Sequence, residues 1–239
     1  MGNLYVANSG NNTIEVFTPG GVGTLFADTG LTTPTTLAFD SEGNLFVGNN
    51  GNSTIQKFTP EGVGTLFANS GLSSPSGMAF DSKGDLFVTN QNDTIVRFKP
   101  DGSHTVFANT GLNRPVGLAF DTSGNLYAAN YSGYTIEAFT PGGMGSVFAN
   151  THLNGTYGLA FDSAGNLYVC NTGDPSIWAF TPGGGGSLFT DTNLHAAVSM
   201  ALTDDLGNPL PLATPEPSAV ASLAVAAATL FSLRRARIR

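Results

Sequence analysis

Four aspartates recur at one position of a repeated motif, and a ring of carboxylates is a set of oxygen donors that could hold a cation. They are Asp40, Asp81, Asp121 and Asp162. Each stands in the pattern Asp-x-x-Gly-Asn/Asp, where the carboxylate caps a tight hairpin and the glycine supplies a positive φ. The pattern therefore favours hairpin caps, and a cation-binding ring is the alternative.

Five asparagines form a second series, each four residues after the leucine of a Gly-Asn/Asp-Leu motif. They are Asn8, Asn49, Asn90, Asn130 and Asn171. Asparagine tolerates the left-handed conformation and hydrogen-bonds to nearby backbone groups. We therefore predict that this series shapes loops.

The three histidines could supply acid–base or metal chemistry if they met other titratable groups. His104, His152 and His195 lie in different repeats, however, and no acidic residue recurs beside them. The single cysteine, Cys170, excludes a disulfide framework and a cysteine-based zinc site, and it replaces small residues of the other repeats. We predict no catalytic residue, no metal site and no cofactor.

Some aromatic residues depart from the repeat. Tyr131 and Tyr134 replace small polar residues in a single loop, while Tyr157 and Trp178 each occur in one repeat only. An exposed aromatic pair could stack on a sugar or anchor a protein partner. Tyr131 and Tyr134 are therefore our candidate surface binding patch, and ordinary variation in a surface loop is the alternative.

The elements that must position these residues follow from internal repetition. The motif Gly-Asn/Asp-Leu-Tyr/Phe begins at residues 2, 43, 84, 124 and 165, so the spacings are 41, 41, 40 and 41. Each unit has four short runs of alternating, β-branched or aromatic residues bounded by Gly, Pro, Asn or Asp, which predicts four antiparallel strands. A four-stranded unit of this length is typical of one β-propeller blade. All phenylalanines except Phe231 fall on repeat positions and are expected between the blades.

The strand count predicts how the ring closes. The chain opens on the second strand of a unit at 4–8, four complete units follow, and a lone first strand lies at 198–203. Residues 198–203 would pair with 4–8 and remove the exposed sheet edges. We predict an all-β fold: a five-bladed β-propeller of four-stranded antiparallel blades over residues 1–206, closed by a C-terminal strand, plus a C-terminal hydrophobic helix.

The expected tunnel strands carry small uncharged residues, which favours close packing over catalysis. They are Thr36, Gly77, Gly117, Gly158 and Ser199, with Ala38, Ala79, Ala119, Ala160 and Ala201.

The charge balance excludes a nucleic-acid-binding protein. With 17 Asp and Glu against 9 Lys and Arg, the net charge is −8, and such a protein should repel nucleic acid.

The pattern Pro-x-Gly-Leu-Ala-Phe-Asp-x-x-Gly-Asn-Leu-Tyr-Val-x-Asn, followed by Thr-Ile-x-x-Phe, resembles the NHL-repeat family of β-propellers over about residues 3–203. Propellers of that family more usually have six blades. Because Met1 falls inside a repeat, a missing signal peptide and a truncated fragment of a larger NHL propeller stay open as expectations.

The C-terminal tail differs in kind. A Pro-rich linker (207–218) contains Pro215, Glu216 and Pro217. The segment 219–239 has an apolar run, 219–233, that predicts a helix separable from the propeller, and it ends in Arg234, Arg235, Arg237 and Arg239. This order resembles the PEP-CTERM sorting signal of Gram-negative bacteria. The resemblance implies a membrane exosortase as partner, transient membrane contact, and export to the cell envelope or extracellular matrix; a generic membrane anchor is the alternative.

We therefore expect an exported, non-enzymatic binding or scaffold module whose ligand is a polysaccharide or a protein. The alternative is a metal-dependent propeller lyase or lactonase acting on a lactone or polysaccharide. A lyase or lactonase should gather titratable residues at the mouth of the tunnel.

Overall fold

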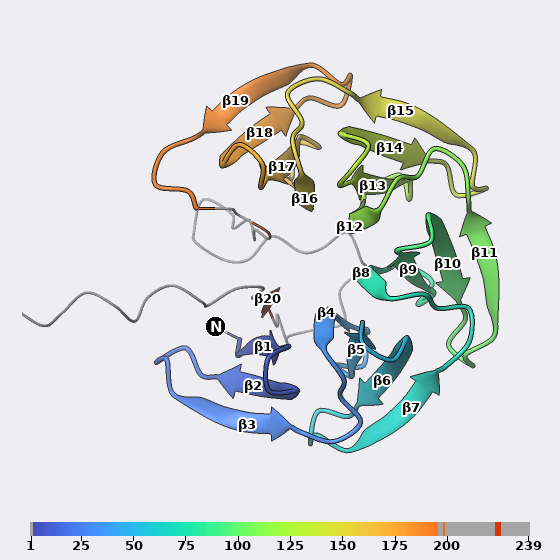
Figure 1. Ribbon diagram of the computed structural model, residues 1–239, viewed down its shortest axis with the longest axis vertical. Helices are drawn as coiled ribbons and strands as arrows, with labels where there is room; N and C mark the ends of the chain where they lie inside the picture. Colours follow the sequence, from blue (N-terminus) through green and yellow to red (C-terminus); the bar gives the residue numbers. More distant parts are fainter. Residues whose placement is uncertain (1, 196–197, 199–222, 226–239) are drawn as a thin grey trace, which may run out of the picture.

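In a computed structural model of the chain, residues 2–195, 198 and 223–225 are described, and they form five four-stranded sheets arranged around an axis (Figure 1). Blade 1 contains β1 (Leu4–Asn8), β2 (Thr13–Phe17), β3 (Gly23–Ala27) and β20 (Leu223–Val225). Blade 2 contains β4 (Pro34–Phe39), β5 (Leu45–Asn49), β6 (Thr54–Phe58) and β7 (Gly64–Ala68). Blade 3 contains β8 (Pro75–Phe80), β9 (Leu86–Asn90), β10 (Thr94–Phe98) and β11 (His104–Ala108).

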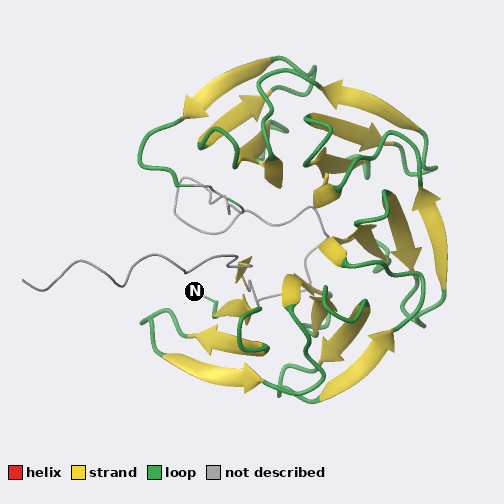
Figure 2. Cartoon of the chain, viewed as in Figure 1, coloured by secondary structure: helices red, strands yellow, loops and turns green. Residues whose placement is uncertain are grey.

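Blade 4 contains β12 (Pro115–Phe120), β13 (Leu126–Asn130), β14 (Thr135–Phe139) and β15 (Gly145–Ala149). Blade 5 contains β16 (Thr156–Phe161), β17 (Leu167–Asn171), β18 (Ser176–Phe180) and β19 (Gly186–Thr190). Figure 2 shows only strands and loops in the described part of the chain. In blades 2 to 5 the first strand lies nearest the axis and the fourth on the circumference, and all pairs within these blades are antiparallel. The predicted five-bladed propeller is confirmed.

Aromatic rings join each blade to the next. Phe46 on β5 packs edge-to-face against Phe67 on β7 of its own blade and Phe80 on β8 of the next, with centroids 4.9 and 5.0 Å apart. The same three-ring contact recurs around Tyr5, Phe87 and Tyr127. Replacing such a buried ring by alanine typically costs about 3–5 kcal/mol. The repeated phenylalanines are therefore the core between blades, as predicted.

Blade 5 ends this series in the described residues. Tyr168 contacts Phe189 of its own blade at 5.2 Å, and Phe189 remains 61% exposed. The corresponding phenylalanines of blades 1 to 4 also pack on a third-strand phenylalanine of the following blade. Among the described residues, Phe189 therefore lacks the contact with a following blade that its counterparts make.

The closing strand differs from our prediction. Strand β20 pairs with β1, and the pairing is parallel, with Leu4 opposite Leu223 and Val6 opposite Val225. Except for Val198, the segment 198–203 that we expected at this edge lies outside the described residues. The inner edge of β1 would otherwise present unpaired backbone groups, and a short apolar segment with leucine and valine suits that edge.

The expected C-terminal helix falls almost wholly outside the described residues. Of the run 219–233, the structure describes only Leu223–Val225, and these residues extend the sheet of blade 1 where a separate helix was predicted. The rest of that run, the linker 207–218 with its Pro-Glu-Pro motif, and the four terminal arginines lie outside the described residues. Over the ranges that are described, no helix has the length and apolar character needed to cross a membrane.

The recurring aspartates cap hairpins. Asp40 Oδ1 accepts hydrogen bonds from the backbone N–H groups of Glu42 (3.0 Å) and Asn44 (2.8 Å), and Oδ2 accepts one from the Asn44 side chain (2.8 Å). Asp121 and Asp162 repeat this arrangement. Because these oxygens already accept hydrogen bonds inside their own turns, the hairpin interpretation holds for this series.

The asparagine series ties the end of the second strand to the loop before the first strand and to the start of the third strand. Asn49 accepts a hydrogen bond from the backbone N–H of Thr32 (3.0 Å) and donates to the carbonyl of Gly30 (2.9 Å) and to Thr54 Oγ1 (3.0 Å). Asn90 and Asn130 make the same three bonds in their blades. These side chains therefore shape the loops at one end of the propeller, as predicted.

Candidate functional site

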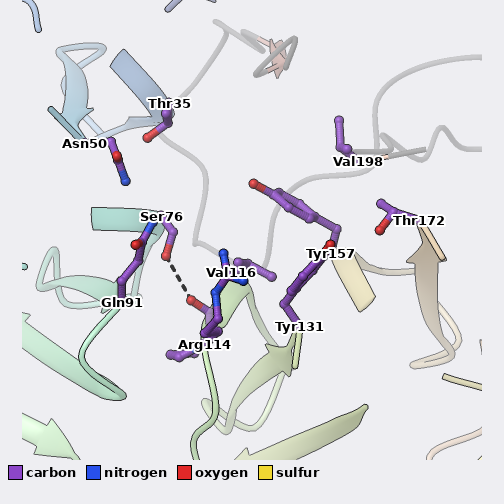
Figure 3. A pocket seen from close by; sticks show the side chains of 11 residues that line it. Thr35, Asn50, Ser76, Gln91, Arg114, Val116, Tyr131, Tyr157, Thr172 and Val198 are labelled. Carbon is purple, nitrogen blue, oxygen red and sulfur yellow. Dashed lines mark hydrogen bonds between the residues drawn. The ribbon is translucent and has the colours of Figure 1, made fainter. Parts of the chain in front are cut away.

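A cavity of about 380 Å³ opens at that same end, around the propeller axis (Figure 3). First strands begin there and second strands end there, so both contribute lining residues. The lining residues are Thr35, Asn50, Ser76, Gln91, Arg114, Pro115, Val116, Tyr131, Tyr157, Thr172 and Val198. Cavities of this size are large enough for a small polar molecule or a unit of a polymer.

At the cavity, equivalent positions of the repeats carry different residue types. The position after the second strand holds Asn50, Gln91, Tyr131 and Thr172 in blades 2 to 5, and all four side chains reach the cavity. The second residue of the first strand is Thr35, Ser76, Val116 and Tyr157 in the same blades. The amide groups therefore come from blades 2 and 3 and the aromatic rings from blades 4 and 5, while Thr172 adds a hydroxyl group from blade 5.

Three side chains form a cluster on the aromatic side. The Arg114 guanidinium carbon lies 5.1 Å from the centroid of the Tyr131 ring, within the range of a cation–π contact. The rings of Tyr131 and Tyr157 meet edge-to-face, with centroids 6.1 Å apart. Burial raises the pKa of Tyr157, and Tyr131 adds to the rise while Arg114 opposes it. The Tyr157 hydroxyl is therefore a neutral hydrogen-bonding group at ordinary pH.

The backbone at Arg114 belongs to the repeat, and only its side chain is particular to blade 4. Arg114 has φ 48°, and its N–H donates to Asp93 Oδ1 at 2.6 Å. Thr33 in blade 2 has φ 49° and donates in the same way to Asn12 at 2.7 Å. The left-handed backbone of Arg114, hydrogen-bonded to Asp93 of the preceding blade, therefore fixes the position of its Cα and the direction of its side chain.

Hydrogen bonds between blades brace the opposite rim. Ser76 Oγ donates to the carbonyl of Pro115 in the next blade at 2.9 Å, the dashed line in Figure 3. Thr35 Oγ1 donates to the carbonyl of Pro75 at 3.2 Å. These hydroxyl oxygens keep lone pairs that can accept a hydrogen bond from a ligand.

Below the mouth, a second cavity of about 170 Å³ is lined mainly by small and apolar residues of the inner strands, including Thr36, Gly77, Met78 and Gly117. A Cβ built at Gly77 would lie 1.7 Å from the Val116 carbonyl oxygen, so only glycine allows the two strands to approach so closely. Across the described ranges, three or more His, Cys, Asp or Glu side chains nowhere gather into a group that could hold a metal. The small residues of the tunnel serve packing, as the sequence indicated.

The structure separates the two tyrosines of our candidate patch. Tyr131 lines the cavity, whereas Tyr134 has φ 52°, is 51% exposed and is not among the lining residues. Tyr157 was noted only as an irregular residue, and Arg114 was missed. Comparing each ring position across the repeats would have found both, because they replace small residues there.

The histidines lie away from the cavity. His152 stacks on Trp178 with centroids 4.0 Å apart, His104 packs near Phe98, and His195 is exposed beyond β19. Cys170 is buried, and burial raises the pKa of its thiol to about 12. The thiol is therefore protonated and unreactive at neutral pH.

No family model matches the chain, and no curated protein matches its sequence. Solved structures share its fold. A chain of a nidogen/laminin complex is 24% identical, with a TM-score of 0.72 over 79% of this chain and 78% of that one. An inactive variant of virginiamycin B lyase from Staphylococcus aureus, solved with quinupristin, is 18% identical, with a TM-score of 0.69 over 83% and 73%.

A gluconolactonase from Xanthomonas campestris is 20% identical, with a TM-score of 0.69 over 82% of this chain and 74% of that one. At these identities the likeness establishes the β-propeller fold alone, and the structures that share it include a chain of a protein complex as well as enzymes.

Proposed function

We propose that this propeller is a non-enzymatic binding module whose axial cavity takes a sugar unit of a polysaccharide. The observation that carries the proposal is the asymmetric lining, with the Tyr131 and Tyr157 rings facing the Asn50 and Gln91 amides across the mouth. Sugar rings have an apolar face that packs on aromatic rings and hydroxyl groups that bond to amides. A scaffold role follows, because a polymer can occupy several copies of the protein at once.

The second candidate is a propeller lyase or lactonase, favoured by the lyase and the gluconolactonase that share the fold. In the described residues, the lining of the axial cavity includes no histidine, aspartate or glutamate. Because histidine, aspartate and glutamate are the side chains that most often act as general bases at neutral pH, this lining supports binding of the ligand over turnover.

One experiment separates these candidates. The purified protein is incubated with soluble polysaccharides and with simple lactones, with and without added Ca²⁺ or Mg²⁺, and both bound ligand and released product are measured. We expect saturable polysaccharide binding with no product. Metal-dependent turnover that is lost on chelation would favour the enzyme.

We further propose that the tail delivers the module to the cell envelope. The support is the order of the Pro215–Pro217 motif, the apolar run and the terminal arginines, since a basic end holds its own side of a membrane in the cytoplasm. Membrane contact through this run requires Leu223–Val225 to leave the edge of β1. In cells, deleting residues 214–239 should move the protein from the membrane fraction to a soluble one, whereas replacing Glu216 by glutamine should block only processing by an exosortase. Membrane retention without the tail would contradict this role.

A further inference from the structure

We propose that the axial cavity selects a carboxylated sugar, a uronic acid unit, because Arg114 offers an uncompensated charge at its mouth; this inference rests on the polysaccharide-binding function proposed above. The candidate ligand is therefore an acidic polysaccharide, although the protein itself carries a net charge of −8. Arg114 would bind the carboxylate, and the neutral groups of the opposite rim would bind the ring hydroxyls.

The Arg114 guanidinium carries a positive charge that no described acidic side chain pairs with. Three of the described cations are already paired: Lys57 with Asp40, and Arg97 and Lys99 with Asp85. Arg114 makes no ion pair with any residue that the structure describes, and none of the cavity-lining residues is acidic. The Asp93 carboxylate is bound to the Arg114 backbone N–H, and the guanidinium is the one charged group of the described lining, so it can attract an anion to the mouth.

The hydrogen-bond donors of the Arg114 side chain are also available to a ligand. The Arg114 backbone N–H is used by Asp93, but within the described chain the guanidinium N–H groups make no hydrogen bond to protein. A guanidinium has five N–H donors in a planar fork that matches a carboxylate bidentately. The guanidinium carbon lies over the Tyr131 ring, 5.1 Å from its centroid, and the N–H groups are left for a ligand.

The position of the Arg114 side chain is restrained in the protein without ligand. The left-handed backbone at Arg114, held by Asp93, and the contact with Tyr131 restrict the side chain before any ligand arrives. Restricting a long side chain in advance lowers the entropy lost on binding. Gln91 and Asn50 line the same cavity and complete it with uncharged donors and acceptors, which suit hydroxyl groups.

The test compares two series of trisaccharides, and within each series the acid, the methyl ester and the neutral sugar differ at the carboxyl position. Isothermal titration measures binding to trimers of galacturonic acid and of mannuronic acid, to their methyl esters, and to the neutral galactose and mannose trimers. We expect at least one acid trimer to bind about tenfold to hundredfold more tightly than its own ester, with an affinity that falls as salt rises.

Arg114→Thr should remove that preference, and this substitution suits the left-handed backbone because Thr33 holds the same conformation. Lys83→Thr is the matched control: it removes one exposed positive charge that has no ion pair in the described part, from a hairpin on the other end of blade 3. The control should keep the preference unchanged.

The outcomes distinguish the two proposals. Equal binding of acid, ester and neutral trimers would overturn the selectivity and leave the saccharide site standing. Absence of binding by all of them would overturn both proposals. A preference for acid that survives Arg114→Thr would show that another cation provides it, and would also overturn the inference.

Discussion

The backbone N–H of Tyr131 donates a hydrogen bond to the carbonyl oxygen of Arg114 at 3.1 Å. The bond extends the pairing of β12 with β13 by one step beyond the strands, and it sets the two side chains next to each other at the mouth of the cavity. Asn50 and Thr33 make the same backbone bond in blade 2, at 3.0 Å, but bring together an amide and a hydroxyl. The same backbone hydrogen bond thus positions a cation–aromatic pair in blade 4 and an amide with a hydroxyl in blade 2.

Replacing Tyr131 by asparagine tests the aromatic side of the cavity. Asparagine occupies the corresponding position in blade 2, so the backbone should be undisturbed. Loss of the ring should weaken polysaccharide binding about tenfold, or about 1.4 kcal/mol. Titration calorimetry checks this, with Tyr134→Asn as control, because Tyr134 lies outside the cavity and Asn12 shares its left-handed φ. Equal effects of the two substitutions would argue against the site.

Replacing Gly77 by alanine tests the close approach of the inner strands. The added methyl group would meet the Val116 carbonyl 1.7 Å away, so the blades must shift apart. We expect a loss of about 3 kcal/mol or more, seen as a fall in Tm of about 6–12 °C. Gly10→Ala is the control, since nothing lies within 4 Å of a Cβ there. A Gly77→Ala protein as stable as the control would contradict the packing described for the tunnel.

The five blades could be predicted because the repeats share the same strand patterns, turn residues and phenylalanine positions. Phe46 and Phe87, for example, occupy equivalent positions and make equivalent contacts. The closing strand could not be predicted this way, because Leu223–Val225 carries no repeat motif and pairs through backbone groups that any apolar segment offers.

The site was harder to predict for a geometric reason. Tyr131 and Tyr157 belong to different blades and meet only because the ring brings those blades side by side. Tyr134 is three residues from Tyr131, yet the left-handed turn at Tyr134 takes it away from the cavity. Sequence alone identified both as irregular aromatics, whereas the distinction between them depends on the turn.

Glu137 gives a pH-dependent prediction. Burial of this side chain on β14 raises the pKa of its carboxyl, so the folded protein holds the proton more tightly than the unfolded chain. Stability should therefore fall as pH rises from below about 4.3, the usual value, through the raised folded-state value. Glu137→Gln, the residue of blade 2 at this position, should gain a few degrees in Tm at pH 7 and match the wild type near pH 3. A stabilisation that is the same at both pH values would contradict this account.

Deleting residues 214–239 tests the closing strand. The deletion removes β20 and leaves the inner edge of β1 without the partner seen in the structure. With three paired residues lost, we expect a decrease in the free energy of unfolding of about 1–3 kcal/mol, or about 2–12 °C in Tm by calorimetry. Deleting only residues 234–239 should have no effect. If the longer deletion also leaves Tm unchanged, another segment covers the edge of β1.

The central claim is that a saccharide binds at the axial cavity, and a crystal structure of the full chain with a bound acidic trimer tests it most directly. We predict a sugar ring against Tyr131, with its carboxylate within hydrogen-bonding distance of the Arg114 guanidinium and its hydroxyl groups facing Gln91 and Asn50. A trimer bound elsewhere on the propeller, with the cavity empty at saturating concentration, would contradict the account.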